Sequence, residues 1–188
     1  NFSLKKLKKS STFNFRKIIS FMKHLILLVF FITTIISCGQ NIEEKKKTKV
    51  LTKGPENGTL LIVGGAASDF FYKEFMNLVG GAQEPIVVIP TAGTSEVISQ
   101  ENLDKFKNSF IKKGFENVTV LHTHNREEAN LDEFIKPLKN AKGVWFNGGR
   151  QWLLADSYLN TKTHEAFKSL LNRGGVIAGS SAGATIQG

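Results

Sequence analysis

The residue whose surroundings point most clearly to catalytic chemistry is a serine close to the end of the sequence. Ser181 stands in the pentapeptide Gly179-Ser180-Ser181-Ala182-Gly183, directly after the apolar run Val176 to Ala178. An apolar strand that breaks into small residues around a serine is typical of a sharp strand-to-helix turn, which exposes the hydroxyl. Larger neighbours would collide with the strand or the helix. The pattern predicts that Ser181 is a nucleophile, with a plain glycine- and serine-rich turn as the alternative.

Backbone amides at two places could stabilise the negative charge that such a nucleophile creates. The amide of Ala182 would lie at the start of the following helix and face an oxyanion. Gly148 and Gly149 follow another apolar run, and a glycine pair lets the backbone turn an amide toward a ligand. Just beyond them, Gln151 could bind a substrate amide or carboxylate, although a capping or surface role fits its position equally well.

Other candidates are weaker. Gly64-Gly65 could bind phosphate, but the third glycine of the dinucleotide fingerprint is missing. His122 and His124 could bind a metal ion from one side of an extended segment, but no third ligand is nearby, which favours polar loop residues. His164 and Asp156 fit helix surfaces. The sequence therefore predicts neither a metal nor an organic cofactor.

The elements that position these residues alternate along the chain. Apolar runs predict strands at 59–63, 85–89, 117–121, 143–149 and 175–179, and helical spacing predicts helices at 69–79, 101–113, 131–138, 151–159 and 164–171. This order predicts an α/β fold of three layers, with helices on both faces of an open, mostly parallel sheet. Ligands bind beyond the carboxyl ends of such strands, where Ser181 and the Gly148-Gly149 pair both fall.

The net charge of +9 does not indicate a nucleic-acid site. Seven of the 25 basic residues precede Cys38, where there is no acidic residue, and the other 18 are nearly balanced by 16 acidic residues. A basic patch on the folded domain is therefore not supported.

The basic leader predicts a targeting segment. Met22 begins a positive region, and Leu25 to Ile36 is apolar but too short to span a ~30 Å hydrocarbon layer comfortably. Ile35-Ile36-Ser37-Cys38 resembles the lipobox of bacterial lipoproteins, so Cys38 is expected to carry the lipid. We thus expect upstream sequence and a signal peptide over residues 1–37, a flexible tether over 38–58, and a catalytic domain over 59–188 that stops early. The expected location is the bacterial cell envelope, where the lipid would anchor the protein to the outer membrane if the cell has one.

Four motifs in order resemble the cyanophycinase and aspartyl dipeptidase family of serine peptidases, peptidase family S51. They are Leu61 to Ala66, Ile89 to Ala92, Phe146 to Gln151 and Gly175 to Ala184. The resemblance implies a fold similar to class I glutamine amidotransferases. It also implies Ser181 as the nucleophile, Ala182 with Gly148-Gly149 as oxyanion amides, and Gln151 as a substrate contact. The implied substrate is a peptide or an aspartate-rich polymer, cut at β-Asp-Arg or Asp-X bonds.

Two departures from the family pattern matter. Many members carry an acidic residue where this chain has Arg150, and the family's histidine and acidic partner are expected after Ser181, where the given sequence ends. We therefore expect the parent protein to be a hydrolase and this polypeptide to be inactive. The alternatives are a lipid-anchored binding protein of the same fold and an α/β-hydrolase esterase. A homodimer is also compatible with the sequence.

Overall fold

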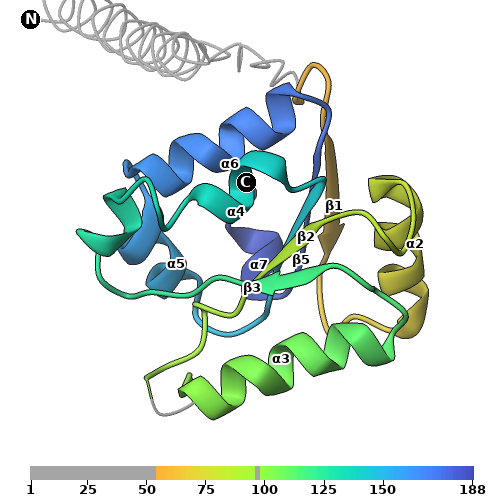
Figure 1. The fold of residues 1–188 in the computed structure, drawn as a ribbon, viewed down its shortest axis with the longest axis horizontal. Coiled ribbons are helices and arrows are strands. Elements are labelled where there is room, and N and C mark those ends of the chain that lie inside the picture. Colours follow the sequence, from red (N-terminus) through yellow and green to blue (C-terminus); the bar gives the residue numbers. More distant parts are fainter. Residues whose placement is uncertain (1–53, 96–97) are drawn as a thin grey trace, which may run out of the picture. The chain divides into compact units, whose positions relative to one another are not determined.

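Five parallel strands form the centre of the fold in the computed structural model, which describes residues 54–95 and 98–188. The strands are β1 (Thr59–Val63), β2 (Ile86–Ile89), β3 (Val118–Val120), β4 (Gly143–Phe146) and β5 (Val176–Ser180). Their order in the sheet is β1-β5-β4-β2-β3, and every neighbouring pair is parallel (Figure 1). The predicted parallel sheet is confirmed.

The central strands are apolar because both of their faces are covered. Every residue of β2 and β4 is buried, as expected for strands that helices cover on each side. Side chains alternate along β4, so that Val144 and Phe146 join one core while Trp145 joins the other. Two hydrophobic cores therefore flank a single sheet.

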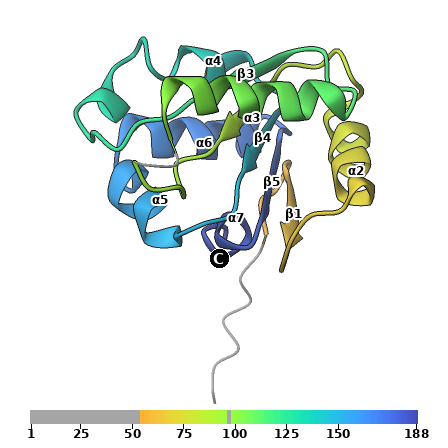
Figure 2. The same cartoon turned by 90° about the horizontal axis from the view of Figure 1, so that it is seen from below.

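Helices cover both faces of the sheet, as predicted. One core contains residues of α2 (Asp69–Val79) and α3 (Gln100–Lys112). The other contains residues of α4 (Lys136–Asn140), α5 (Gln151–Tyr158) and α6 (Lys162–Asn172). Figures 1 and 2 show these two groups of helices on opposite sides of the strands. The result is the three-layer α/β arrangement.

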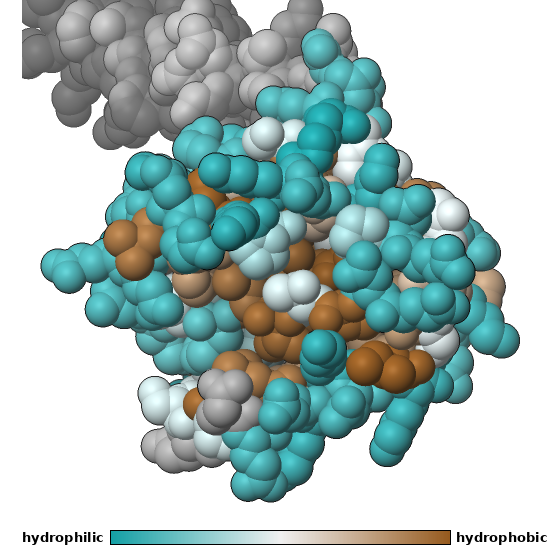
Figure 3. Space-filling view, in the orientation of Figure 1, coloured by the Kyte–Doolittle hydropathy of each residue, from teal (hydrophilic) through white to brown (hydrophobic). Residues whose placement is uncertain are grey.

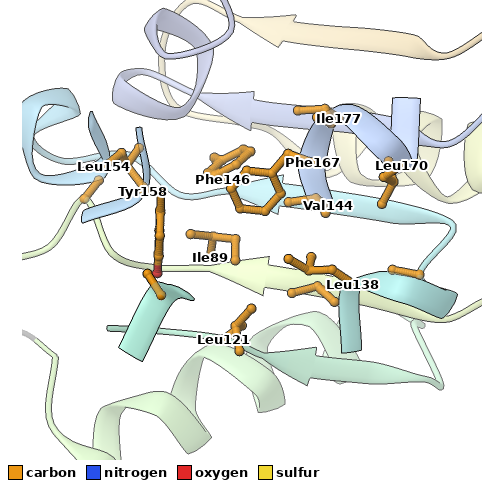
Figure 4. Packing of buried hydrophobic residues seen from close by; sticks show 14 of the residues in the cluster. Ile89, Leu121, Leu138, Val144, Phe146, Leu154, Tyr158, Phe167, Leu170 and Ile177 are labelled. Atoms are coloured by element: carbon orange, nitrogen blue, oxygen red, sulfur yellow. The ribbon is translucent and has the colours of Figure 1, made fainter. Parts of the chain in front are cut away.

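The two cores differ in composition. Trp145 stacks on Tyr72 with ring centroids 4.6 Å apart and meets Phe75 edge-on at 5.4 Å, so the core under α2 and α3 is aromatic. The opposite core is largely aliphatic around Phe146 and Phe167, and Figure 4 shows Leu154 and Tyr158 of α5 at one end of it. On the face drawn in Figure 3, apolar side chains gather centrally within a polar surround.

The predicted helix over 131–138 is wrong. The chain instead forms a 3-10 turn, η1 (Glu128–Asn130), and the helix α4 begins only at Lys136. Pro137 lies in the first turn of α4, where its missing amide costs no hydrogen bond, whereas in the middle of a longer helix it would break one. Helix α6 begins earlier than predicted because the Thr161 hydroxyl caps it by accepting from the amide of His164 at 3.4 Å.

The predicted leader, the lipidation site Cys38 and most of the tether lie outside the described residues. Within 54–95 and 98–188, no helix combines the length and the apolar character that crossing a bilayer requires.

Two glycines set the distance between the last strand and the short helix α7 (Ala182–Thr185). A Cβ on Gly183 would overlap the carbonyl oxygen of Phe146 and lie 2.8 Å from its Cβ, and a Cβ on Gly179 would overlap the carbonyl of Gly183. Helix α7 therefore rests directly on the backbone of β4 and β5, a contact that any side chain at these positions would prevent.

Replacing Gly183 by alanine should lower the free energy of unfolding by roughly 2 to 3 kcal/mol, because the backbone of β4 would have to move away. Gly64→Ala is the matched control, since a Cβ on Gly64 meets no atom within 4 Å, and it should change stability by no more than about 0.5 kcal/mol. Urea unfolding of both variants measures the difference. Equal stabilities would contradict the close contact.

Candidate active site

Ser181 occupies a strained turn between β5 and α7. Its φ of 52° and ψ of −114° lie where residues other than glycine are rarely found. Three backbone hydrogen bonds maintain this conformation: its amide donates to the carbonyl of Val63 at 3.0 Å, and its carbonyl accepts from Ala184 at 2.9 Å and Thr185 at 3.0 Å. The residue is exposed. A serine is thus held out at the carboxyl edge of the sheet.

The segment after β4 reaches the same point. A Cβ placed on Gly148 would lie 3.3 Å from the Cβ of Ser181 and 3.4 Å from the carbonyl oxygen of Ser180. The two segments meet because β4 and β5 are neighbours that run parallel. The structure therefore brings Gly148 beside Ser181, and both lie at carboxyl ends of strands, where the sequence analysis expected them.

Gly149 is fixed against the end of β2. Its φ of 145° belongs to the region that favours glycine, and a Cβ there would overlap the carbonyl oxygen of Ala92. The same carbonyl accepts a hydrogen bond from the amide of Arg150 at 2.8 Å. The loop after β2 therefore determines where the Gly148-Gly149 backbone lies.

Three amides near Ser181 remain without acceptors. Within the described part of the chain, the N–H groups of Gly148, Gly149 and Ala182 make no hydrogen bond. Ala182 is buried, and an amide without an acceptor there carries an energetic cost unless a ligand or water pairs with it. Helix α7 is a single turn, so any anion binding here depends on the amides themselves more than on a helix dipole.

The remaining predicted contact, Gln151, is the first residue of α5 and is exposed. It follows Arg150, which caps the same helix without a side-chain hydrogen bond. Gln151 therefore lies two residues beyond the oxyanion candidate Gly149, with its side chain open to solvent.

His122 and His124 lie together at the same edge of the sheet, with their rings edge-on and 4.8 Å apart. Nδ1 of His122 is 2.9 Å from the hydroxyl of Thr91, and the two nitrogens of His124 are 3.3 Å from Ser157 Oγ and 3.2 Å from the carbonyl of Gly93. In the described ranges, no three His, Cys, Asp or Glu side chains converge as metal ligands would. The pair is occupied in a hydrogen-bond network.

The centre of this network is the pair Thr91 and Tyr158, which the sequence analysis did not identify. The hydroxyl of Thr91, fully buried, is 2.7 Å from that of Tyr158, and the Tyr158 oxygen also accepts from the amide of Thr123 at 3.2 Å. Burial raises the pKa of Tyr158 to about 12. The only sequence signal was a polar residue after Pro90 at a strand end, and its partner lies 67 positions away.

The network ties the loop that supports Gly149 to helix α5. Thr91 precedes Ala92, whose carbonyl contacts Gly149 and binds Arg150, and Tyr158 ends α5. Because the hydroxyl bond between Thr91 and Tyr158 is buried, it is less exposed to competition from water. The geometry beside Ser181 thus depends on buried side chains behind it.

Burial lowers the pKa of His122 from 6.5 to about 4; repulsion from His124 adds to this, while Glu128 opposes it. Between pH 4 and pH 6.5, His122 binds more protons in the unfolded chain than in the folded chain. The stability that neutral His122 contributes is therefore fully present above pH 6.5 and is lost as the pH drops toward 4.

We expect the His122→Gln variant to lose less stability than the wild type when the pH falls from 6.5 to 4. Each pKa unit corresponds to about 1.4 kcal/mol, but His122 is half-buried, so solvent screening should leave a difference of roughly 1 to 2 kcal/mol. Urea unfolding at a series of pH values gives the two slopes. Parallel slopes would show that His122 is not desolvated.

Comparison with known proteins agrees with this architecture. The sequence pattern of peptidase family S51 matches residues 59–188. A crystal structure of a peptidase from an acI-B1 Actinobacterium superposes with a TM-score of 0.58 at 29% identity, over 70% of this chain and 57% of that one. A putative peptidase E from Listeria monocytogenes EGD-e gives a TM-score of 0.49 at 20% identity, over 68% of this chain and 60% of that one.

No curated protein matches the chain. The chain spans somewhat less than two thirds of each of these solved peptidases. Because the family pattern covers the whole α/β unit from β1 to Gly188, the chain belongs to peptidase family S51.

Proposed function

We propose that the full-length protein is a serine peptidase in which Ser181 forms an acyl-enzyme. The observation that carries the proposal is the exposed Ser181 in a strained turn, with Gly148 beside it and three amides without acceptors nearby. Backbone strain at a single serine is a common feature of functional sites, and membership of a peptidase family supports a nucleophilic role.

The reaction follows from this arrangement. Oγ of Ser181 attacks the carbonyl carbon of the peptide bond while a base takes its proton. The carbonyl oxygen becomes negative and is stabilised by the amides of Ala182 and of Gly148 or Gly149. The C–N bond then breaks, the amine leaves with a proton, and water hydrolyses the Ser181 ester. This sequence requires no cofactor.

The general base is proposed to lie outside the 188 residues. In the described part of the chain, no side chain is hydrogen-bonded to the hydroxyl of Ser181, and both His122 and His124 are bound elsewhere. The actinobacterial peptidase is longer, since this chain covers 57% of it. A serine without a base is a weak nucleophile, so we propose that the 188-residue polypeptide hydrolyses peptides negligibly.

The proposed substrate class is aspartyl peptides, as in cyanophycinase, cut at β-Asp-Arg or Asp-X bonds. Support comes from the motif resemblance around Phe146 to Gln151 and from the exposed position of Gln151 near Gly149. A lipid on Cys38 would hold the enzyme at the cell envelope, a proposal that rests on the lipobox sequence alone.

A second candidate is a lipid-anchored binding protein that has lost catalysis. It is favoured by one observation, the absence of a base hydrogen-bonded to Ser181 among the described residues. Such a protein would still bind a carbonyl or carboxylate oxygen at the free amides.

A serine-directed fluorophosphonate probe should label the full-length protein at Ser181. Ser181→Ala should abolish labelling and lower aspartyl-peptide hydrolysis by roughly four to six orders of magnitude, because the nucleophile is removed. Mass spectrometry locates the probe, and product release from Asp-X peptides measures hydrolysis.

The neighbouring substitution Ser180→Ala is the matched control and should retain labelling. If the folded wild-type protein takes up no probe, the peptidase proposal is wrong and the protein is a binding protein. Labelling at Ser180 in place of Ser181 would overturn the assignment of the nucleophile.

A further inference from the structure

The loop that follows β2 is fastened to two other parts of the fold. Residues Pro90 to Gly93 form a turn, closed by a backbone hydrogen bond of 2.8 Å between its first and last residues. The Thr91 hydroxyl lies 2.7 Å from that of Tyr158, in α5, and 2.9 Å from Nδ1 of His122, in the segment after β3. From the same segment, Nε2 of His124 lies 3.2 Å from the last carbonyl of the turn. The position of this loop is therefore set by side chains outside it.

The loop presents one carbonyl to the Gly148-Gly149 pair. The carbonyl oxygen of Ala92 accepts from the amide of Arg150 at 2.8 Å, and a Cβ on Gly149 would overlap the same oxygen. Ala92 follows Thr91 directly, so a shift of Thr91 would move this carbonyl and the glycine backbone that rests on it. The direction of the proposed oxyanion amides therefore depends on the position of Thr91.

The buried hydrogen bonds around Thr91 can be paired completely in only one direction. The amide of Thr123 can only donate, so the Tyr158 oxygen accepts from it at 3.2 Å. The Tyr158 proton then goes to the Thr91 oxygen, and the Thr91 proton goes to Nδ1 of His122. The reverse direction would leave the buried Tyr158 proton without an acceptor among the described residues, which is energetically costly.

This chain of hydrogen bonds requires a hydroxyl at position 91. Thr91 must accept one hydrogen bond and donate another, and of the uncharged side chains of its size only a hydroxyl does both through one atom. Thr91 and Tyr158 are both buried, so water is poorly placed to replace a missing partner. Burial also lowers the pKa of His122 to about 4, so at neutral pH its ring is neutral and can accept.

We propose that Thr91 is a positioning residue for the oxyanion amides. Its hydroxyl, which accepts from Tyr158 and donates to His122, fixes the Ala92 carbonyl. That carbonyl in turn fixes the direction of the Gly148-Gly149 backbone. The inference rests on the proposed function, because it names what holds the donors that stabilise the transition state. Loss of the Thr91 hydroxyl should therefore slow the chemical step and leave ground-state binding unchanged.

Saturation kinetics of fluorophosphonate labelling at Ser181, in the full-length protein, separate these two effects. Thr91→Val keeps the shape of the side chain and removes the hydroxyl. It should lower the maximal labelling rate by roughly 10- to 100-fold, the effect of a small misplacement near the reacting atoms. The half-saturating probe concentration should change by less than about twofold, because binding is not affected. Thr91→Ser restores the hydroxyl and should label within about threefold of the wild-type rate.

A double-mutant cycle tests whether Thr91 and Tyr158 act through their shared hydrogen bond. Tyr158→Phe removes the other hydroxyl and should also lower the maximal rate. Because both substitutions break the same bond, the combined variant should label no more slowly than Thr91→Val alone. If the two effects multiply, the hydroxyls act independently and the proposal is wrong.

Thr163→Val is the matched control. Thr163 is also fully buried, but its hydroxyl donates to the carbonyl of Ala129 at 2.7 Å and not to the loop after β2. This substitution should lower the thermal stability as Thr91→Val does and leave labelling unchanged. If it slows labelling as much as Thr91→Val, the effect is a general loss of stability. Wild-type labelling by Thr91→Val, or labelling by Thr91→Ser as slow as that of Thr91→Val, would equally overturn the proposal.

Hydrogen exchange at the Arg150 amide tests the positioning without any labelling. This amide is bonded to the Ala92 carbonyl, so Thr91→Val should speed its exchange by roughly tenfold or more, whereas Thr163→Val should not. If the wild-type protein is not labelled but exchange responds in this way, the peptidase proposal fails and Thr91 still positions the glycines. Unchanged exchange in Thr91→Val would remove the positioning role, whether or not the protein is labelled.

Discussion

The candidate active site depends on the direct contact of backbone with backbone beneath Ser181. Gly183 lies against the carbonyl of Phe146, and Gly179 lies against the carbonyl of Gly183, with no room for a side chain at either place. Because α7 cannot move away from the sheet without losing this contact, the residue between strand and helix is forced into a positive φ. The serine is exposed as a consequence of packing below it.

The opposite side of the site is held by a different kind of interaction. The glycines after β4 take their place from the loop after β2, through the contact of Gly149 with Ala92 and the hydrogen bond from Arg150. Thr91 in that loop is in turn bound to Tyr158 at the end of α5. Close packing places Ser181, and a buried polar network places the glycines that lie beside it, so the two halves of the candidate site have separate structural supports.

Arg150 follows the Gly148-Gly149 pair directly, and across the described ranges its side chain forms no salt bridge. The backbone of this position is tied down through Ala92, so the charge of the side chain can change without disturbing the glycines.

The sequence by itself determined the fold class and the strand ends, because periodicity and glycine positions are local properties. The runs around Val87 and Val144 predicted buried parallel strands, and the break at Gly179 to Gly183 predicted the turn that holds Ser181. The local pattern predicted the wrong bounds for the helix near Pro137, because the proline ring is tolerated in the first turn of a helix and not in its middle. The sequence placed Gly148 and Ser181 at the same edge of the sheet, but only the tertiary structure decided that β4 and β5 are neighbours, which brings the two residues together. It also decided that Thr91 binds Tyr158, because spacing along a sequence carries no information about which distant residues meet.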